Sequence, residues 1–101
     1  MTFSEDDTIE ITIEGIGPES YLADGIETIV TADVIDAPNG DDVAAFVELQ
    51  DDIGGLDEGR IDRDREPMMA SGVMDMLTTY DSEKDEGPHY AGRIKNVRIV
   101  E

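Results

Sequence analysis

The chain contains no cysteine and no tryptophan, and His89 is its only histidine. Disulfide scaffolds, thiolate metal sites and thiol nucleophiles are therefore excluded. A hydrolytic triad or a histidine metal site would have to be built around His89, which stands in a Gly-Pro turn just before Tyr90. The serines lack a nucleophile-elbow context, and no glycine-rich phosphate loop is present. We predict no catalytic residue, no cofactor and no metal site.

Long apolar runs are also missing, since no stretch of about 18 residues is predominantly hydrophobic. The N-terminal residues do not show the basic and then apolar pattern of a secretory signal. We therefore expect a chain that neither spans a membrane nor is secreted by a signal peptide. Hydrophobic residues make up 39% of the 101 residues and are grouped into short runs. That is enough for a small core, and we expect one β-rich domain over residues 1–101.

Basic residues are scarce, because 26 Asp and Glu stand against 7 Lys and Arg and give a formal net charge of -19. Self-repulsion at that charge opposes folding in dilute buffer. At about 1 M salt the Debye length falls to roughly 3 Å, and the repulsion is screened. The composition resembles that of salt-in halophile proteins and predicts a high-salt cytoplasm or a virion as the location. The alternative is an acidic mesophile domain that mimics nucleic acid or binds cations.

The few cations are unevenly placed along the chain. The first 50 residues hold 13 acids and no base, whereas Arg93, Lys95 and Arg98 fall within six residues near the other end. We call these three residues the cationic stripe, and Tyr90 stands just before it. We predict that Arg93, Lys95, Arg98 and Tyr90 form an interface in which the stripe of one copy meets the acidic first half of the next. The alternative is pairing with carboxylates of the same chain, which would make the stripe a stabilising feature and put the interface elsewhere.

Alternating apolar residues predict several strands. In residues 8–14, Ile9, Ile11 and Ile13 alternate with Thr and Glu, the pattern of a half-buried strand. β-Branched residues dominate residues 26–36, and alternation returns in residues 43–50. Residues 91–101 close the chain as a further strand, and the glycine-rich residues 15–25 are a connection.

Asn39-Gly40 lies between two of these strands and is the preferred pair for a two-residue type I′ hairpin turn. If these two residues form the loop, six apolar residues share one face of the hairpin, which we predict to be the core face. The predicted pairs are Val34 with Ala45, Ala32 with Val47, and Val30 with Leu49.

Residues 51–66 are rich in glycine and charge, and we expect an exposed excursion, with a short edge strand as an alternative for part of it. Residues 67–80 are ambiguous. Apolar residues at helical spacing from Met69 to Tyr80, after Pro67, favour an amphipathic helix. Against this, Gly72, Thr78 and Thr79 are poor helix formers, and a strand over residues 72–80 would pair naturally with the last segment. We favour the helix, so the predicted fold class is mainly β, a small antiparallel sandwich or barrel of about five strands with one short helix near 67–80.

The lack of catalytic groups favours a non-catalytic structural or assembly module. Its small β body would self-associate or dock on a larger protein partner. A small, acidic, β-rich protein of this kind would suit a virion head or tail in a halophilic system. We predict that it is not an enzyme.

The alternative function is single-stranded nucleic-acid binding. Residues 28–55, with strand, turn, strand and Asp51-Asp52-Ile53-Gly54-Gly55, resemble the middle of an OB-fold of the replication protein A type. The resemblance implies a five-stranded barrel with stacking aromatics in a cationic groove. This sequence departs from that pattern, because the hairpin offers Phe46 alone and no cation.

Overall fold

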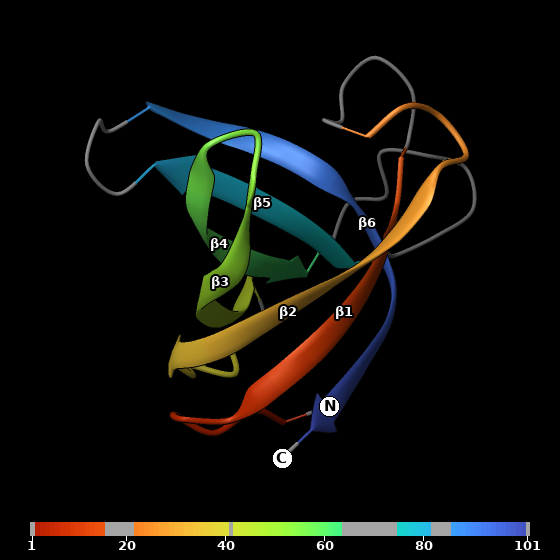
Figure 1. The fold of residues 1–101 in the computed structure, drawn as a ribbon. Helices are drawn as coiled ribbons and strands as arrows, with labels where there is room; N and C mark the ends of the chain where they lie inside the picture. The colour runs from red at the N-terminus through yellow and green to blue at the C-terminus, as the bar shows by residue number, and fades with distance from the viewer. Residues whose placement is uncertain (1, 16–21, 41, 64–74, 82–85, 101) are drawn as a thin grey trace.

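The computed structural model describes residues 2–15, 22–40, 42–63, 75–81 and 86–100 and shows an all-β chain (Figure 1). Six strands follow one another: β1 (Thr8–Glu14), β2 (Glu27–Asp36), β3 (Val43–Ile53), β4 (Leu56–Arg63), β5 (Asp75–Asp81) and β6 (Glu86–Val100). Each strand pairs antiparallel with the next, and β6 returns to pair with β1, so that the sheet closes into a barrel. The predicted mainly β class and small barrel are confirmed, with six strands in place of about five.

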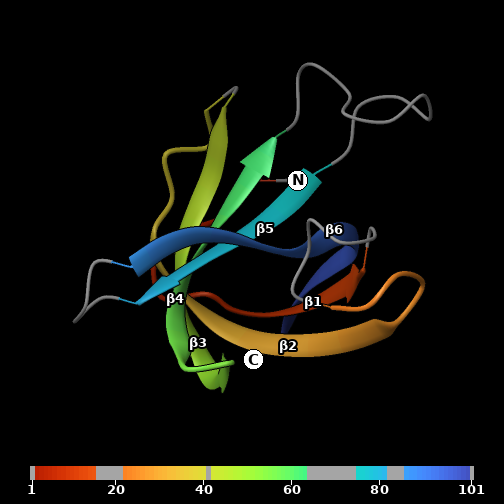
Figure 2. The ribbon, with the colours of Figure 1, turned by 90° about the horizontal axis from the view of Figure 1, so that it is seen from above.

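The barrel closes because β6 pairs with two neighbouring strands, β5 and β1. Residues 86–93 pair with β5, and residues 93–100 pair with β1. In Figures 1 and 2, β6 is the long curved ribbon that runs beside β5 and then bends toward β1. Gly92 lies at the change of partner, where an added Cβ would be 2.6 Å from the backbone oxygen of Glu14. The two backbones approach so closely that only glycine fits at this position without a shift.

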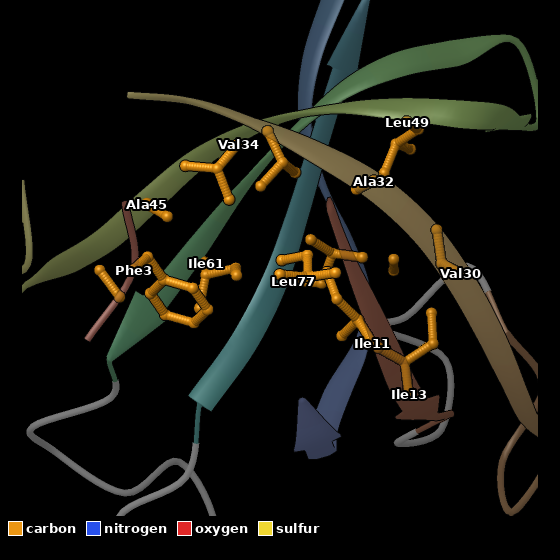
Figure 3. Packing of buried hydrophobic residues seen from close by; sticks show 14 residues of the cluster. Phe3, Ile11, Ile13, Val30, Ala32, Val34, Ala45, Leu49, Ile61 and Leu77 are labelled. Atoms are coloured by element: carbon orange, nitrogen blue, oxygen red, sulfur yellow. The ribbon is translucent and has the colours of Figure 1, made fainter. Parts of the chain in front are cut away.

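The core is built from inward-facing positions of the alternating strands (Figure 3). In β1, Ile9, Ile11 and Ile13 are 0% exposed, whereas the Thr and Glu residues between them are partly exposed. β2 and β3 contribute the six residues predicted for the core face, and all six are buried: Val30, Ala32, Val34, Ala45, Val47 and Leu49. Ile61 of β4 and Leu77 of β5 pack against them.

The β2–β3 hairpin keeps the predicted core face but not the predicted register. Ala32 pairs with Leu49, and Val34 pairs with Val47. Each partner lies two residues beyond the predicted one, so the predicted register is wrong. A shift of two residues leaves the same side chains on the core face, because side chains alternate along a strand with a period of two.

The register differs because Asn39-Gly40 does not form the expected turn. Asn39 has a φ of 49°, but Gly40 is not among the residues with positive φ, and a type I′ turn needs positive φ at both. Instead, the N–H of Asn39 donates to the Ala44 oxygen at 3.0 Å and the N–H of Gly40 donates to the Val43 oxygen at 2.9 Å. These bonds place the turn after Gly40. At these bonds the partners lie four residues beyond the predicted ones, and a ladder irregularity between Val34 and Asp36 reduces the offset to the two residues seen at Ala32 and Val34.

The Asn39 side chain has a different role, which is to hold the N-terminal segment. Its Oδ1 accepts the N–H of Phe3 at 2.8 Å, and its Nδ2 donates to the Phe3 oxygen at 3.0 Å. The Phe3 ring is 4% exposed and packs in the core beside Ala45 and Ile61 (Figure 3). This asparagine therefore joins the segment before β1 to the barrel.

The type I′ geometry occurs between β3 and β4, where Gly54 and Gly55 have φ of 59° and 88°. Ile53 and Leu56 pair directly across this turn. β4 then pairs with β3 on one side and β5 on the other. Asp51, Asp52, Gly54 and Gly55 are exposed as expected, but the predicted exposed excursion is wrong for residues 56–63. Gly54 and Gly55 form the hairpin turn, whereas Gly59 and the charged residues from Asp57 to Arg63 belong to a barrel strand paired on both sides.

The segment predicted as a short helix near 67–80 is a strand where it is described. β5 pairs with both β4 and β6, and residues 67–74 lie outside the described residues. Residues 76–79 are at most 3% exposed, so both faces of this stretch are covered. β-Branched threonines suit a strand covered on both faces. The helix is therefore wrong for residues 75–81, and the strand alternative is confirmed there.

The order of the strands also bears on the OB-fold resemblance. An OB-fold is a five-stranded Greek-key barrel. Here every strand neighbours the next in sequence, and the first pairs with the last. This is an up-and-down arrangement, and it does not support the resemblance of residues 28–55 to an OB-fold.

Candidate interaction surface

The cationic stripe lies on the outer face of the sheet formed by β6, β1 and β2, and each of its residues is ion-paired within the chain. Arg93 Nη2 lies 2.5 Å from Glu14 Oε1, and Arg98 Nη2 lies 2.5 Å from Glu10 Oε1. Lys95 Nζ reaches across β1 to Glu27 Oε2 at 3.4 Å and lies 3.7 Å from Glu14 Oε2.

These ion pairs follow from the closure of the barrel. The register sets Glu10 opposite Arg98 and Glu14 opposite Arg93, so acids from the start of the chain meet cations from its end. The structure thus shows the stabilising alternative for the stripe. Its role in an interface stays a prediction, and the stripe no longer offers free cations to a partner.

Tyr90, the fourth predicted interface residue, lies on a different part of β6. It pairs with Thr78 of β5, before β6 crosses to β1, and is 38% exposed. The ion pairs of the cationic stripe lie along the half of β6 that pairs with β1. The four predicted interface residues are thus divided between the part of β6 that pairs with β5 and the part that pairs with β1, and their action as one surface stays a prediction.

A different surface is left open where β2 and β3 separate. Residues 27–33 of β2 pair with β1, whereas pairing with β3 begins only at Ala32. Within the described strands, residues 27–31 therefore have a neighbour on one side only, and we call this stretch the β2 edge. In Figures 1 and 2 this half of β2 diverges from the β3–β4 hairpin. At the point of separation, Gln50 Nε2 donates to Asp33 Oδ1 at 3.3 Å.

A groove of about 290 Å³ lies between the β2 edge and the β3–β4 turn. We call it the edge groove. Its lining combines apolar side chains with two carboxylates: Leu22, Thr28, Ile29, Val30, Thr31, Asp51, Asp52, Ile53 and Gly54. Ile29 is 63% exposed, and Ile26 just before the β2 edge is 53% exposed. Large apolar side chains therefore flank an unpaired strand, an arrangement that favours contact with another chain.

The charge around the edge groove is negative. Asp51 and Asp52 are exposed, and no hydrogen bond or ion pair of either carboxylate occurs among the residues that the structure describes. Glu27, at the start of the β2 edge, has a side chain that is 49% exposed. Among the described residues its carboxylate forms an ion pair only with Lys95. The groove therefore joins an open backbone edge, apolar contacts and uncompensated carboxylates.

This surface carried a sequence signal that the predictions did not use. With Val30, Ala32 and Val34 on the core face, Ile29 falls on the outer face with Thr31 and Asp33. An isoleucine between polar residues on a wet face is such a signal. That β2 lacks a second neighbour there could not be read from the sequence, because it depends on where β3 turns away.

Acids of β4 form hydrogen bonds with residues of β4 and β5. Arg60 Nε donates to Asp62 Oδ1 at 2.5 Å, and Thr78 Oγ1 donates to Asp62 Oδ2 at 2.5 Å. Nearby, burial and the negative charge and hydrogen bond of Glu58 raise the pKa of Tyr80 above its usual value of 10.0. The bonds of Thr78 with Asp62 and of Tyr80 with Glu58 join β5 to β4. No group of three or more His, Asp or Glu is placed to hold a metal ion in the described part of the chain.

The described residues contain no helix long and apolar enough to cross a membrane. Comparison of the chain with protein-family models, with curated proteins and with solved structures finds no match.

Proposed function

We propose that the protein is a non-catalytic structural or assembly module of a halophilic system, which works by docking on other protein chains. The observation that carries the proposal is the β2 edge, which no described strand pairs with on one side and which has exposed isoleucines and a groove beside it. Such an edge is a ready template for pairing with another chain.

The halophilic part of the proposal rests on the net charge of -19. Hydrogen bonds between strands and apolar contacts act at short range and persist when salt screens long-range attraction. An edge of this kind therefore suits association in concentrated salt. A virion head or tail is an assembly that such a module would serve, and this narrower hypothesis rests on the general character of the chain.

Nucleic-acid binding receives less support. A binder of single strands needs a cationic groove with aromatic side chains. The edge groove is lined by Asp51 and Asp52, and the cationic stripe is already paired with Glu10, Glu14 and Glu27.

The test is to measure the mass of the protein in multimolar KCl under three conditions. These are the protein alone, with short single-stranded DNA, and with other proteins of the cells or virions that contain it. A salt-stable oligomer, or a complex with one of those proteins and none with DNA, supports the proposal. A monomer that shifts in mass only with DNA contradicts it and supports the nucleic-acid alternative.

A further inference from the structure

We infer that the β2 edge and the edge groove accept an extended segment of a partner protein, in which an apolar side chain is flanked by Lys or Arg. The inference rests on the proposed docking function and specifies its partner. The segment would add to the β6–β1–β2 sheet as a fourth strand.

The first step concerns the backbone of the β2 edge. The Ile26 oxygen accepts the N–H of Gly15, and the N–H of Val34 donates to the Asp7 oxygen. Both of these even-numbered residues therefore direct their backbone groups toward the β1 side. In an antiparallel strand, alternate residues direct these groups to opposite neighbours. Ile29 and Thr31 consequently direct their N–H and C=O groups toward the side where β3 has separated. An added strand would satisfy them.

The second step concerns the apolar contacts. Ile29 stands beside the open edge and Ile53 borders the groove from β3. The volume of about 290 Å³ lies just below the range of ordinary small-molecule sites, which span about 300–1,000 Å³. The groove is also an open one, bordered along one side by a strand. A few side chains of an extended peptide fit that shape better than an enclosed ligand does.

The third step concerns charge, which selects between partners. Asp51, Asp52 and Glu27 border the site. A second copy of this chain would bring the same carboxylates to the β2 edge, and like charges on adjacent strands are destabilising. A segment with Lys or Arg beside its apolar residue would instead form contacts of opposite charge. At high salt these contacts persist only between groups that touch, as neighbours across a strand pair do.

The free protein offers a first test, because the inference requires an alternating pattern of amide exchange. The amides of Val30 and Ala32, which face β1, should exchange slowly in KCl solution. Those of Ile29 and Thr31 should exchange near the rate of an unstructured amide. Equal protection of all four amides would overturn the inference, since the edge would then be covered.

The second test uses a short capped peptide of alternating valine and lysine as the probe. Nuclear magnetic resonance in KCl should show shifts confined to residues 27–31 and 51–54, together with slowed exchange at Ile29 and Thr31. A peptide of alternating valine and glutamate should bind at least tenfold more weakly, as should the valine-lysine peptide with N-methylated valines. Equal binding of the three peptides, or shifts elsewhere on the barrel, would overturn the inference.

Two variants at one position separate the backbone from the side chain. Ile29→Pro removes an N–H that points away from β1, so the bonds to β1 remain and proline is tolerated there. We expect it to weaken binding of the valine-lysine peptide about tenfold. Ile29→Val keeps the N–H and should bind nearly as the parent does. Asp51→Lys with Asp52→Lys should also weaken binding, and is the second probe if Ile29→Pro does not fold.

The outcomes distinguish the inference from the proposed function. Assembly in KCl that survives both Ile29→Pro and the double lysine variant would overturn the inference and leave the docking function standing. Peptide binding at the β2 edge by a protein that forms no assembly with any protein would support the inference and contradict the assembly role.

Discussion

Replacing Gly92 with alanine tests how the barrel closes. Gly92 lies where β6 changes partner from β5 to β1. An added Cβ would lie 2.6 Å from the Glu14 oxygen and 3.1 Å from the Glu14 carbon, whereas ordinary contacts begin at 3.4 Å. Both atoms belong to the backbone, so no side chain can rotate away. β6 must therefore move away from β1 at Glu14. The carboxylate of Glu14 also forms the ion pair with Arg93.

Overpacking of this kind costs about 1–3 kcal/mol of unfolding free energy. For a domain of this size each kcal/mol lowers the melting temperature by about 4–8 °C, so we expect Gly92→Ala to lower it by at least about 4 °C. The assay is thermal unfolding followed by circular dichroism in KCl, with reversibility checked by cooling and rescanning.

Gly40→Ala is the matched control for Gly92→Ala. Gly40 does not have positive φ, and the nearest atom to an added Cβ there is the Val43 oxygen at 3.4 Å. The control should melt close to the parent, or slightly above it, since alanine restricts the unfolded chain. If Gly92→Ala and Gly40→Ala have the same melting temperature, then β6 and β1 are not in close contact at Glu14, and the account of the closure is wrong.

Three further predictions concern charge and ionisation. Stability to urea should rise strongly between about 20 mM and about 2 M KCl because the repulsion behind the charge of -19 is screened; equal stability in both, after a sucrose control for solute exclusion, would contradict salt adaptation. The raised pKa of Tyr80 means that the folded state holds the phenolic proton more tightly, so its contribution to stability is complete below pH 10.0 and is lost as the pH rises through the folded pKa. Unfolding free energy followed above pH 10.0 should fall less steeply in Tyr80→Phe than in the parent. Arg93→Gln should destabilise more than Arg98→Gln in urea titrations, each by about 1 kcal/mol or less, because the Arg93 side chain is 30% exposed and that of Arg98 is 66% exposed; the reverse order would contradict the assigned pairs.

The core of this barrel was predictable because it depends on local alternation. Ile9, Ile11 and Ile13 alternate with polar residues and so indicate the buried face of β1. The same period of two identified the inward residues of β2 and β3. That assignment survived an error of two residues in the register. Side chains alternate between the two faces of a strand, so a register shift by an even number of residues leaves the same side chains in the core.

Turn positions were less predictable, because two sequences in the chain suit the same turn. Asn39-Gly40 and Gly54-Gly55 both favour positive φ. Contacts with distant residues decided between them. The Asn39 side chain is engaged by Phe3, which is 36 residues away in sequence, while nothing lies within 4 Å of a Cβ built at Gly55. Propensity identifies where a turn can form, and tertiary contacts select which one does.

The ion pairs of the cationic stripe could not be predicted without the order of the strands in the sheet. The sequence shows acids at one end of the chain and cations at the other, which is compatible with contacts between copies or within one copy. Closure of β6 on β1 brings Glu10 and Glu14 to Arg98 and Arg93. A barrel that joins its first and last strands can neutralise within one molecule a charge separation that an open sheet would present to a partner.

Among the described strands, the open edge lies on β2 because β3 turns away from it. β6 satisfies both β5 and β1 along its length, whereas β3 leaves β2 to form its own tight hairpin with β4. An exposed edge invites pairing with identical chains, and proteins protect such edges with charge. Asp51 and Asp52, whose carboxylates have no partner among the described residues, provide that charge here. Like carboxylates brought into contact remain unfavourable even at a Debye length of about 3 Å, because salt screens only incompletely over distances shorter than about one Debye length. The acids that oppose pairing between copies therefore also select a cationic segment as the fourth strand.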